Sequence, residues 1–141
     1  MKHLTTPGAL LAAAIAVTGC SSGAVSADRL GSAVGLAYQR LYVVQQHDLG
    51  RTDVTPPDRA TTCTRNGSTA HSGSGSWVCT VHFPHPDGHL VPLSFDVVVQ
   101  PIGCYTATGP PAVVGQLTLS SPASGPVTNP LFAFDGCLTT G

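Results

Sequence analysis

Five cysteines constrain this chain more than any other feature, because an odd number cannot all form disulfides within one molecule. They are Cys20, Cys63, Cys79, Cys104 and Cys137. Cys20 lies apart from the others, at the end of an apolar run near the N-terminus. If Cys20 serves another purpose, an even set of four remains. Two disulfides can then cross-link the rest of the chain, as is common in small exported domains.

The first 19 residues are typical of a signal peptide. Lys2 supplies a positive charge, and residues 9–17 form an unbroken apolar stretch. A membrane-spanning helix needs roughly 20 apolar residues, so this stretch is too short to span a bilayer. The small residues Thr18 and Gly19 then precede Cys20, as in the lipobox of a bacterial lipoprotein. Cleavage there makes Cys20 the first residue, whose thiol accepts a diacylglyceryl group.

This motif predicts the location of the protein. Two acyl chains hold a protein stably at a membrane, whereas one chain binds only reversibly. We therefore expect a signal peptide over residues 1–19, a lipidated tether over 20–27 and a single domain over 28–141. The protein would be anchored at the cell membrane through Cys20, on the extracytoplasmic face. The alternative is an ordinary signal peptide followed by a coincidental cysteine.

The composition of residues 20–141 excludes some classes of partner. This part contains no lysine and no glutamate, and its five arginines and seven aspartates give a formal charge of 5 − 7 = −2. A basic surface for nucleic acid and a polybasic patch for anionic lipid are therefore not expected.

The four remaining cysteines allow three disulfide pairings. We favour Cys63–Cys79 and Cys104–Cys137, because the first two cysteines fall on neighbouring strands of a predicted hairpin. A zinc site with four cysteine ligands is the alternative. It is disfavoured because no C-x-x-C spacing occurs in the sequence.

One amphipathic helix is predicted before Gly50. Its apolar face repeats at helical spacing through Leu30, Val34, Tyr38, Leu41 and Gln45, with Ala37 and Tyr42 beside it. Ser26 is a suitable N-cap, and Gly50 a suitable end. Gly31 and Gly35 are unfavourable within a helix. Either the helix begins after them, or they allow it to pack closely on a sheet.

The chain after Pro56-Pro57 has the pattern of β structure. Strands are predicted at 60–65, 76–83, 90–100, 104–108, 116–120 and 131–135, with a surface loop over 121–130. Trp77, Cys79 and Val81 alternate with more polar residues, which is typical of a half-buried strand. Short turns between the strands favour hairpins. The predicted fold is α+β, with one N-terminal amphipathic helix packed on an antiparallel β-meander and two disulfides.

Three histidines on one predicted hairpin are the candidate metal ligands. His82, His85 and His89 lie close in sequence, with Asp87 among them. Imidazoles beside a carboxylate can bind Zn²⁺ or Cu²⁺. However, prolines restrict the backbone here, and the spacing matches no established metal motif. We therefore favour a solvated polar loop without a cofactor, and keep the metal site as the alternative.

Catalytic motifs are not found in the sequence, so an enzyme is not expected. Gly73-Ser74-Gly75 does not match the G-x-S-x-G motif of serine hydrolases. The aspartates are scattered; Asp96 suits an outward strand position and Asp135 a turn. Trp77 and Tyr105 are predicted core residues, although an exposed aromatic anchor for a partner is the alternative.

Three motifs carry a resemblance to a known group of proteins. They are Trp77-Val78-Cys79, a Gly-Cys-Tyr-Thr-Ala segment over 103–107 and an Ala-Phe-Asp-Gly-Cys segment over 133–137. In this order they resemble small, uncharacterised lipoproteins and secreted proteins of actinobacteria. The resemblance covers most of the domain and departs at Leu138, where the group has an aromatic residue. It implies a compartment and a disulfide pattern, but no activity.

The sequence therefore predicts a membrane-anchored extracytoplasmic lipoprotein. Its expected role is a non-catalytic binding or accessory module for an envelope protein or glycan. The alternative is a metal-binding lipoprotein that uses the hairpin of His82, His85 and His89.

Overall fold

Helix α1 (Ala27–Asp48) opens the part of the chain described by the computed structural model, residues 25–138. The predictions for Cys20 and for the signal peptide lie outside these residues. Ser26 caps the helix, and its Oγ accepts a hydrogen bond from the Arg29 amide at 3.3 Å. Gly50, with a φ of 83°, follows the last turn. The predicted start and end of the helix are confirmed.

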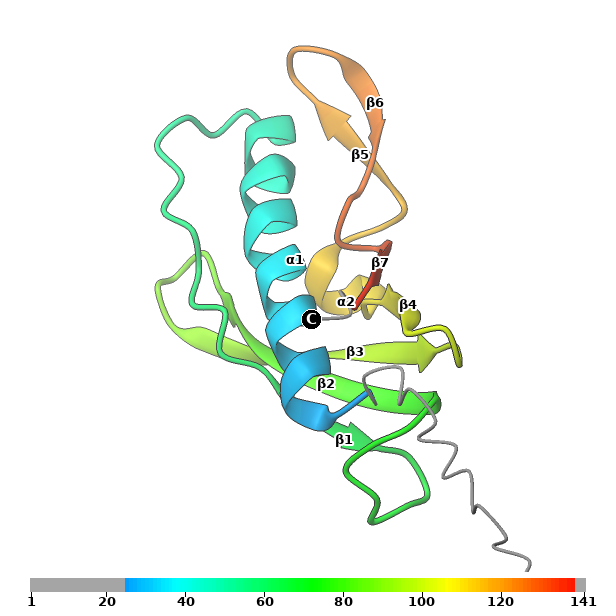
Figure 1. Ribbon diagram of the computed structural model, residues 1–141. Helices are drawn as coiled ribbons and strands as arrows, with labels where there is room; N and C mark the ends of the chain where they lie inside the picture. The colour runs from blue at the N-terminus through cyan, green and yellow to red at the C-terminus, as the bar shows by residue number, and fades with distance from the viewer. Residues whose placement is uncertain (1–24, 139–141) are drawn as a thin grey trace, which may run out of the picture.

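An antiparallel sheet follows the helix (Figure 1). Its strands are β1 (Thr62–Arg65), β2 (Gly75–Pro84), β3 (Leu90–Val99), β4 (Cys104–Thr108) and β7 (Ala133–Cys137). They lie side by side in the order β1-β2-β3-β4-β7. Between β4 and β7 the chain forms α2 (Pro111–Val114) and a separate hairpin of β5 (Thr118–Ser121) and β6 (Gly125–Thr128). The predicted α+β architecture is confirmed.

The structure differs from the sequence prediction mainly between β4 and β7. The predicted surface loop over 121–130 contains β6, which pairs with β5 around Gly125, at a φ of 75°. Helix α2 was not predicted, because a helix of four residues has no periodicity to detect. The last strand begins two residues later than predicted, since Leu131 leads into the sheet rather than pairing within it.

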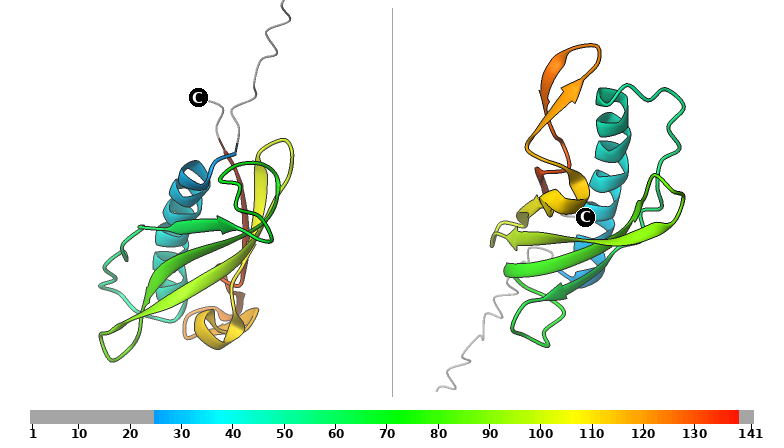
Figure 2. Two further views of the ribbon diagram at one scale, coloured as in Figure 1. Left: turned by 90° about the horizontal axis from the view of Figure 1, so that it is seen from below. Right: turned by 180° about the vertical axis from the view of Figure 1, so that it is seen from behind.

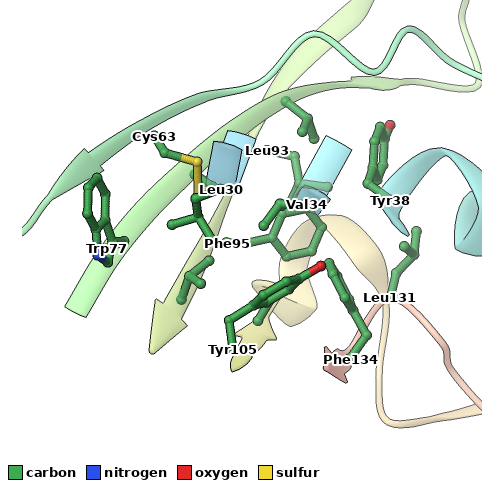
Figure 3. Packing of buried hydrophobic residues seen from close by; sticks show 14 of the residues in the cluster. Leu30, Val34, Tyr38, Cys63, Trp77, Leu93, Phe95, Tyr105, Leu131 and Phe134 are labelled. Atoms are coloured by element: carbon green, nitrogen blue, oxygen red, sulfur yellow. A yellow bond between two sulfur atoms is a disulfide. The ribbon is translucent and has the colours of Figure 1, made fainter. Parts of the chain in front are cut away.

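The core lies between α1 and one face of the sheet (Figures 2 and 3). Alternate residues of β2 and β3 point into it, as the period of two predicted. The largest fully buried side chains are Trp77, Tyr38, Phe95, Leu30, Leu93 and Leu131. On the opposite face of β3, Ser94, Asp96 and Val98 are exposed. One helix therefore covers one side of the sheet.

Trp77 and Tyr105 are core residues. Trp77 is 1% exposed, and its Nε1 donates to the Gly73 carbonyl oxygen at 3.1 Å. It shares the buried face of β2 with Cys79. Tyr105 is also buried. The alternative of an exposed aromatic anchor is therefore wrong for both side chains.

Each disulfide joins an edge strand to its neighbour. Cys63 lies directly opposite Cys79 in the β1–β2 register, with a Cα–Cα distance of 4.1 Å. Cys104 lies opposite Cys137 in the β4–β7 register, at 3.8 Å. The favoured pairing is confirmed. The first bridge is buried, whereas Cys137 is exposed and Cys104 is half-buried.

Gly31 and Gly35 allow α1 to approach the extended chain before β1, at residues 59–61. A Cβ on Gly35 would lie 2.1 Å from the carbonyl oxygen of Arg59 and 2.4 Å from Oγ1 of Thr61. A Cβ on Gly31 would lie 2.9 Å from the carbonyl oxygen of Thr61. These distances leave no room for a side chain. Of the two explanations for the glycines, close packing is the correct one.

Contacts between the N-terminal residues and the rest of the fold begin at Val25, ahead of α1. Val25 is buried, and its carbonyl oxygen accepts a hydrogen bond from the Gly73 amide at 2.8 Å. The Ala27 amide donates to the carbonyl oxygen of His71 at 3.0 Å. These contacts attach the residues before the helix to the loop that leads into β2.

A buried amide network attaches the β5–β6 hairpin to the end of α1. Nε2 of Gln45 donates to Oδ1 of Asn129 at 2.9 Å and to the Val114 carbonyl oxygen at 2.7 Å. Nδ2 of Asn129 donates to the same carbonyl at 2.8 Å and to that of Gln116 at 3.0 Å. Both side-chain amides are almost fully buried, so these hydrogen bonds replace the ones that the amides would make with water in the unfolded chain.

Replacing Gly35 by alanine should destabilise the protein. At a solvent-exposed position inside a helix, this change stabilises a protein by about 1 kcal/mol. Here the added methyl group would force α1 away from Arg59. Overpacking of this kind lowers the free energy of unfolding by about 1–3 kcal/mol. Urea unfolding measures the difference. Ser32→Ala, on the exposed face of the same helix, is the matched control and should change stability little. A stabilised Gly35→Ala variant would contradict the close approach.

The two disulfides should differ in their reaction with reductant. Under native conditions a water-soluble phosphine should open Cys104–Cys137 first, because Cys137 is exposed to solvent. Alkylation of freed thiols followed by peptide mass spectrometry identifies the reduced pair. Unfolding in urea before reduction is the control, since both bridges should then react together. Preferential opening of Cys63–Cys79 would contradict the burial order.

Candidate functional site

The tip of the β2–β3 hairpin, residues 85–89, holds the densest cluster of candidate ligands. The tip is closed by two backbone hydrogen bonds, from His85 to the His89 carbonyl oxygen and from Gly88 to that of His85, both at 2.9 Å. Gly88 adopts a φ of 93°, a conformation that side chains disfavour. Pro84 and Pro86 restrict the backbone on either side of His85. The sequence therefore folds here into a short, closed turn.

Both imidazoles of the tip face one carboxylate. Nδ1 of His85 lies 2.9 Å from Oδ1 of Asp87, and Nδ1 of His89 contacts the same oxygen. The two rings stack with their centroids 4.8 Å apart and their planes at 21°. The backbone amide of His89 also donates to Oδ1 of Asp87, at 3.2 Å. One carboxylate thus organises the whole tip.

These hydrogen bonds set the protonation of Asp87. Desolvation acts to raise the pKa of the carboxyl group, but it is outweighed by the amide of His89 and by both imidazoles, chiefly that of His85. The pKa of Asp87 therefore lies below its ordinary value. The carboxylate is charged at neutral pH and available as an oxygen ligand.

The structure separates the three predicted histidines. His85 and His89 come together with Asp87, and one ligand atom from each lies within 4.8 Å of the others. His82 is exposed on β2, opposite Pro92 of β3, and does not belong to this group. Its backbone carbonyl oxygen instead accepts a hydrogen bond from the Tyr38 hydroxyl at 2.9 Å. The carboxylate between two histidines was the informative signal in the sequence.

A groove between α1 and β7 is a second candidate surface, which the sequence did not indicate. It has a volume of about 690 Å³. Asp28, Arg29 and Arg40 line it from the helix, and Asp135 and Leu138 from the sheet side. Both signs of charge are therefore present along an open depression. Such a surface is suited to contact with a partner rather than to enclosing a small molecule.

The aspartates singled out in the sequence lie apart from the hairpin tip. Asp96 is exposed on the open face of the sheet, as the strand alternation predicted. Asp135 lies within β7, at the groove, rather than in a turn. Among residues 25–138, every buried side-chain nitrogen or oxygen has a hydrogen-bond partner. That the protein is not an enzyme stays a prediction.

Comparison with protein-family models, with curated proteins and with solved structures finds no match to this chain. Within residues 25–138, neither helix has the length and apolar character needed to cross a bilayer.

Tyrosine ionisation should limit stability at alkaline pH. Burial, with a smaller contribution from nearby Tyr42, raises the pKa of Tyr38 well above its ordinary value, and burial followed by Asp135 raises that of Tyr105. The folded state thus holds these protons more tightly than the unfolded chain. Their contribution is complete below about pH 10, the ordinary pKa of tyrosine, and is lost as the pH rises above it.

Urea unfolding at increasing pH, from neutral to about pH 11, tests this expectation. The free energy of unfolding should fall above about pH 10, and Tyr38→Phe should make that fall less steep. The variant also loses the hydrogen bond to His82, so its stability at neutral pH provides the baseline. Equal slopes for both proteins would contradict the role of Tyr38.

Proposed function

We propose that this protein is a lipid-anchored extracytoplasmic module that binds an envelope partner without catalysing a reaction. The observation that carries the proposal is the pairing of Cys63 with Cys79 and of Cys104 with Cys137. Cys20 is therefore left without a disulfide partner among the cysteines of the chain. A lone cysteine that follows a signal-like segment suits lipid attachment, and two disulfides suit an oxidising compartment.

The geometry of the domain fits an anchor at one end. Val25 and Ala27 bind the loop at 71–73, next to the start of β2, and this end is called the base. Only four residues lie between Cys20 and Val25, and the five steps along the chain reach at most about 18 Å. Strand β2 then runs from the base to the hairpin tip, over about 30 Å for its ten residues. An anchored domain would hold its base near the bilayer and its tip away from it.

The base also carries an apolar residue in solvent. Ile102, in the turn between β3 and β4, is 76% exposed. This turn lies at the base because Val99 pairs with Gly75 at the start of β2. The Leu138 amide donates to the Gly103 carbonyl oxygen at 2.9 Å, which places another apolar residue beside the turn. Apolar side chains at this end suit contact with the interfacial region of a membrane.

The groove between α1 and β7 is the surface that we propose for the partner, an envelope protein or a glycan. Its lining residues carry charges of both signs, Arg40 and Asp135 among them, and can recognise polar groups of either sign. It does not depend on the metal chemistry of the tip. The formal charge of −2 over residues 20–141 gives no support for nucleic acid as the partner.

Replacing Cys20 by alanine should release the protein from the membrane. The wild-type protein, expressed in a bacterium that lipidates exported proteins, should incorporate an alkyne-labelled fatty acid and sediment with membranes. The variant should do neither, because it lacks the thiol that accepts the lipid. Cys104→Ala with Cys137→Ala is the matched control, which loses two cysteines and their disulfide but keeps Cys20 and therefore the label. An unlabelled wild-type protein would overturn the lipid anchor.

A separate experiment addresses the partner. Residues 20–141 contain no lysine, so amine-reactive crosslinkers are unsuitable and a photoreactive amino acid is needed. We would place it at Arg40, in the groove, and at Asp96, on the open sheet face, as the comparison. Irradiation of intact cells should capture one defined adduct through position 40. Repeated absence of an adduct there would count against the binding module.

A further inference from the structure

We propose that the hairpin tip binds one late first-row transition-metal ion, Cu²⁺ more tightly than Zn²⁺, through His85, Asp87 and His89. The site goes beyond the lipid-anchored module proposed above and does not depend on it. It also differs from the histidine set suggested by the sequence, because Asp87 replaces His82 as the third ligand.

The ligand types select this class of metal. Two imidazoles and one carboxylate are borderline and hard donors, which suit Cu²⁺, Zn²⁺ and Ni²⁺. For a given set of such donors, affinity rises along the first-row series to a maximum at Cu²⁺ and then falls at Zn²⁺. The four cysteines of the domain are held in disulfides, so they do not offer a competing thiolate site.

The three donors are already gathered before a metal arrives. Their ligand atoms lie within 4.8 Å of one another, and both Nδ1 atoms face the same oxygen of Asp87. A metal bound at about 2.0–2.2 Å from each donor would hold the donors about 3–4 Å apart. A small rotation of the side chains is sufficient, and their exposure allows it: 49%, 53% and 60% for His85, Asp87 and His89.

The backbone reduces the entropy that binding must overcome. One of the two hydrogen bonds that close the tip joins the ligands His85 and His89, and the other joins Gly88 to His85. Pro84 and Pro86 restrict the chain on either side of His85. The turn is therefore ordered in the same conformation that presents the ligands. His82 and Pro92 lie three positions down the hairpin from His85 and His89, paired within the β2–β3 ladder.

The exposure of the site determines how it would work. Three ligands from one turn leave coordination positions open to water or to a donor from another molecule. A metal held there would exchange readily, in contrast to a buried structural metal. The tip is also the end of β2 farthest from the base. In the anchored protein, the site would thus be accessible from the side away from the membrane.

Titration of the purified protein with Cu²⁺, and separately with Zn²⁺, tests the proposal in the presence of a weak competing chelator. We expect one Cu²⁺ per chain, with electron paramagnetic resonance showing coordination by two nitrogens. His85→Gln and His89→Gln should each weaken binding at least tenfold. Asp87→Asn should weaken it less, because the amide oxygen still accepts the hydrogen bond from His89.

The controls separate this site from other surface histidines. His82→Gln and His71→Gln should bind Cu²⁺ as the wild-type protein does. Unfolding in urea checks that every variant keeps the native stability, which an exposed tip predicts. Full binding by a variant lacking both His85 and His89, or equal loss in His82→Gln, would overturn the three-ligand site. Neither result bears on the lipid at Cys20, which is measured by labelling.

Discussion

Helix α1 reaches the sheet because Gly31 and Gly35 present only hydrogen atoms to the chain before β1. The carbonyl oxygens of Arg59 and Thr61 occupy the space where side chains would stand. At this separation Leu30, Val34 and Tyr38 are fully buried between helix and sheet. Among residues 25–138, α1 is the only helix longer than four residues, so no second long helix compensates for a poor fit. The depth of this contact therefore controls how much apolar surface leaves water.

The covalent links act where the sheet is otherwise weakest. An edge strand has a neighbour on one side only, and both β1 and β7 are edges. Each is joined to its neighbour by a disulfide between directly opposed residues, Cys63–Cys79 and Cys104–Cys137. The central strands β2 and β3, which pair over ten residues, carry no such link to each other. The cross-links thus complement the hydrogen bonding rather than repeat it.

Local patterns in the sequence predicted the parts of the fold that depend on local rules. The period of two placed Trp77 and Cys79 in the core, and Ser26 marked the start of α1. The elements between β4 and β7 were harder, because Asn129 and Gln45 lie 84 residues apart and their amide contact has no local signature. The metal candidates show the same division. The sequence indicated the hairpin and the carboxylate among its histidines, but only the structure shows that His82 lies outside the cluster of His85, Asp87 and His89.

The insertion of α2, β5 and β6 between β4 and β7 has a consequence for the order of folding. Strands β1 to β4 are joined by successive hairpins, whose contacts are close in sequence and form rapidly. Strand β7 pairs with β4 only after the chain has passed through this insertion. Cys104 and Cys137 are 33 residues apart in sequence, whereas Cys63 and Cys79 are 16 apart. Because closure of a longer loop loses more chain entropy, the β4–β7 edge should be the last part of the sheet to assemble. An exported chain would therefore complete its sheet only after its C-terminal segment had emerged.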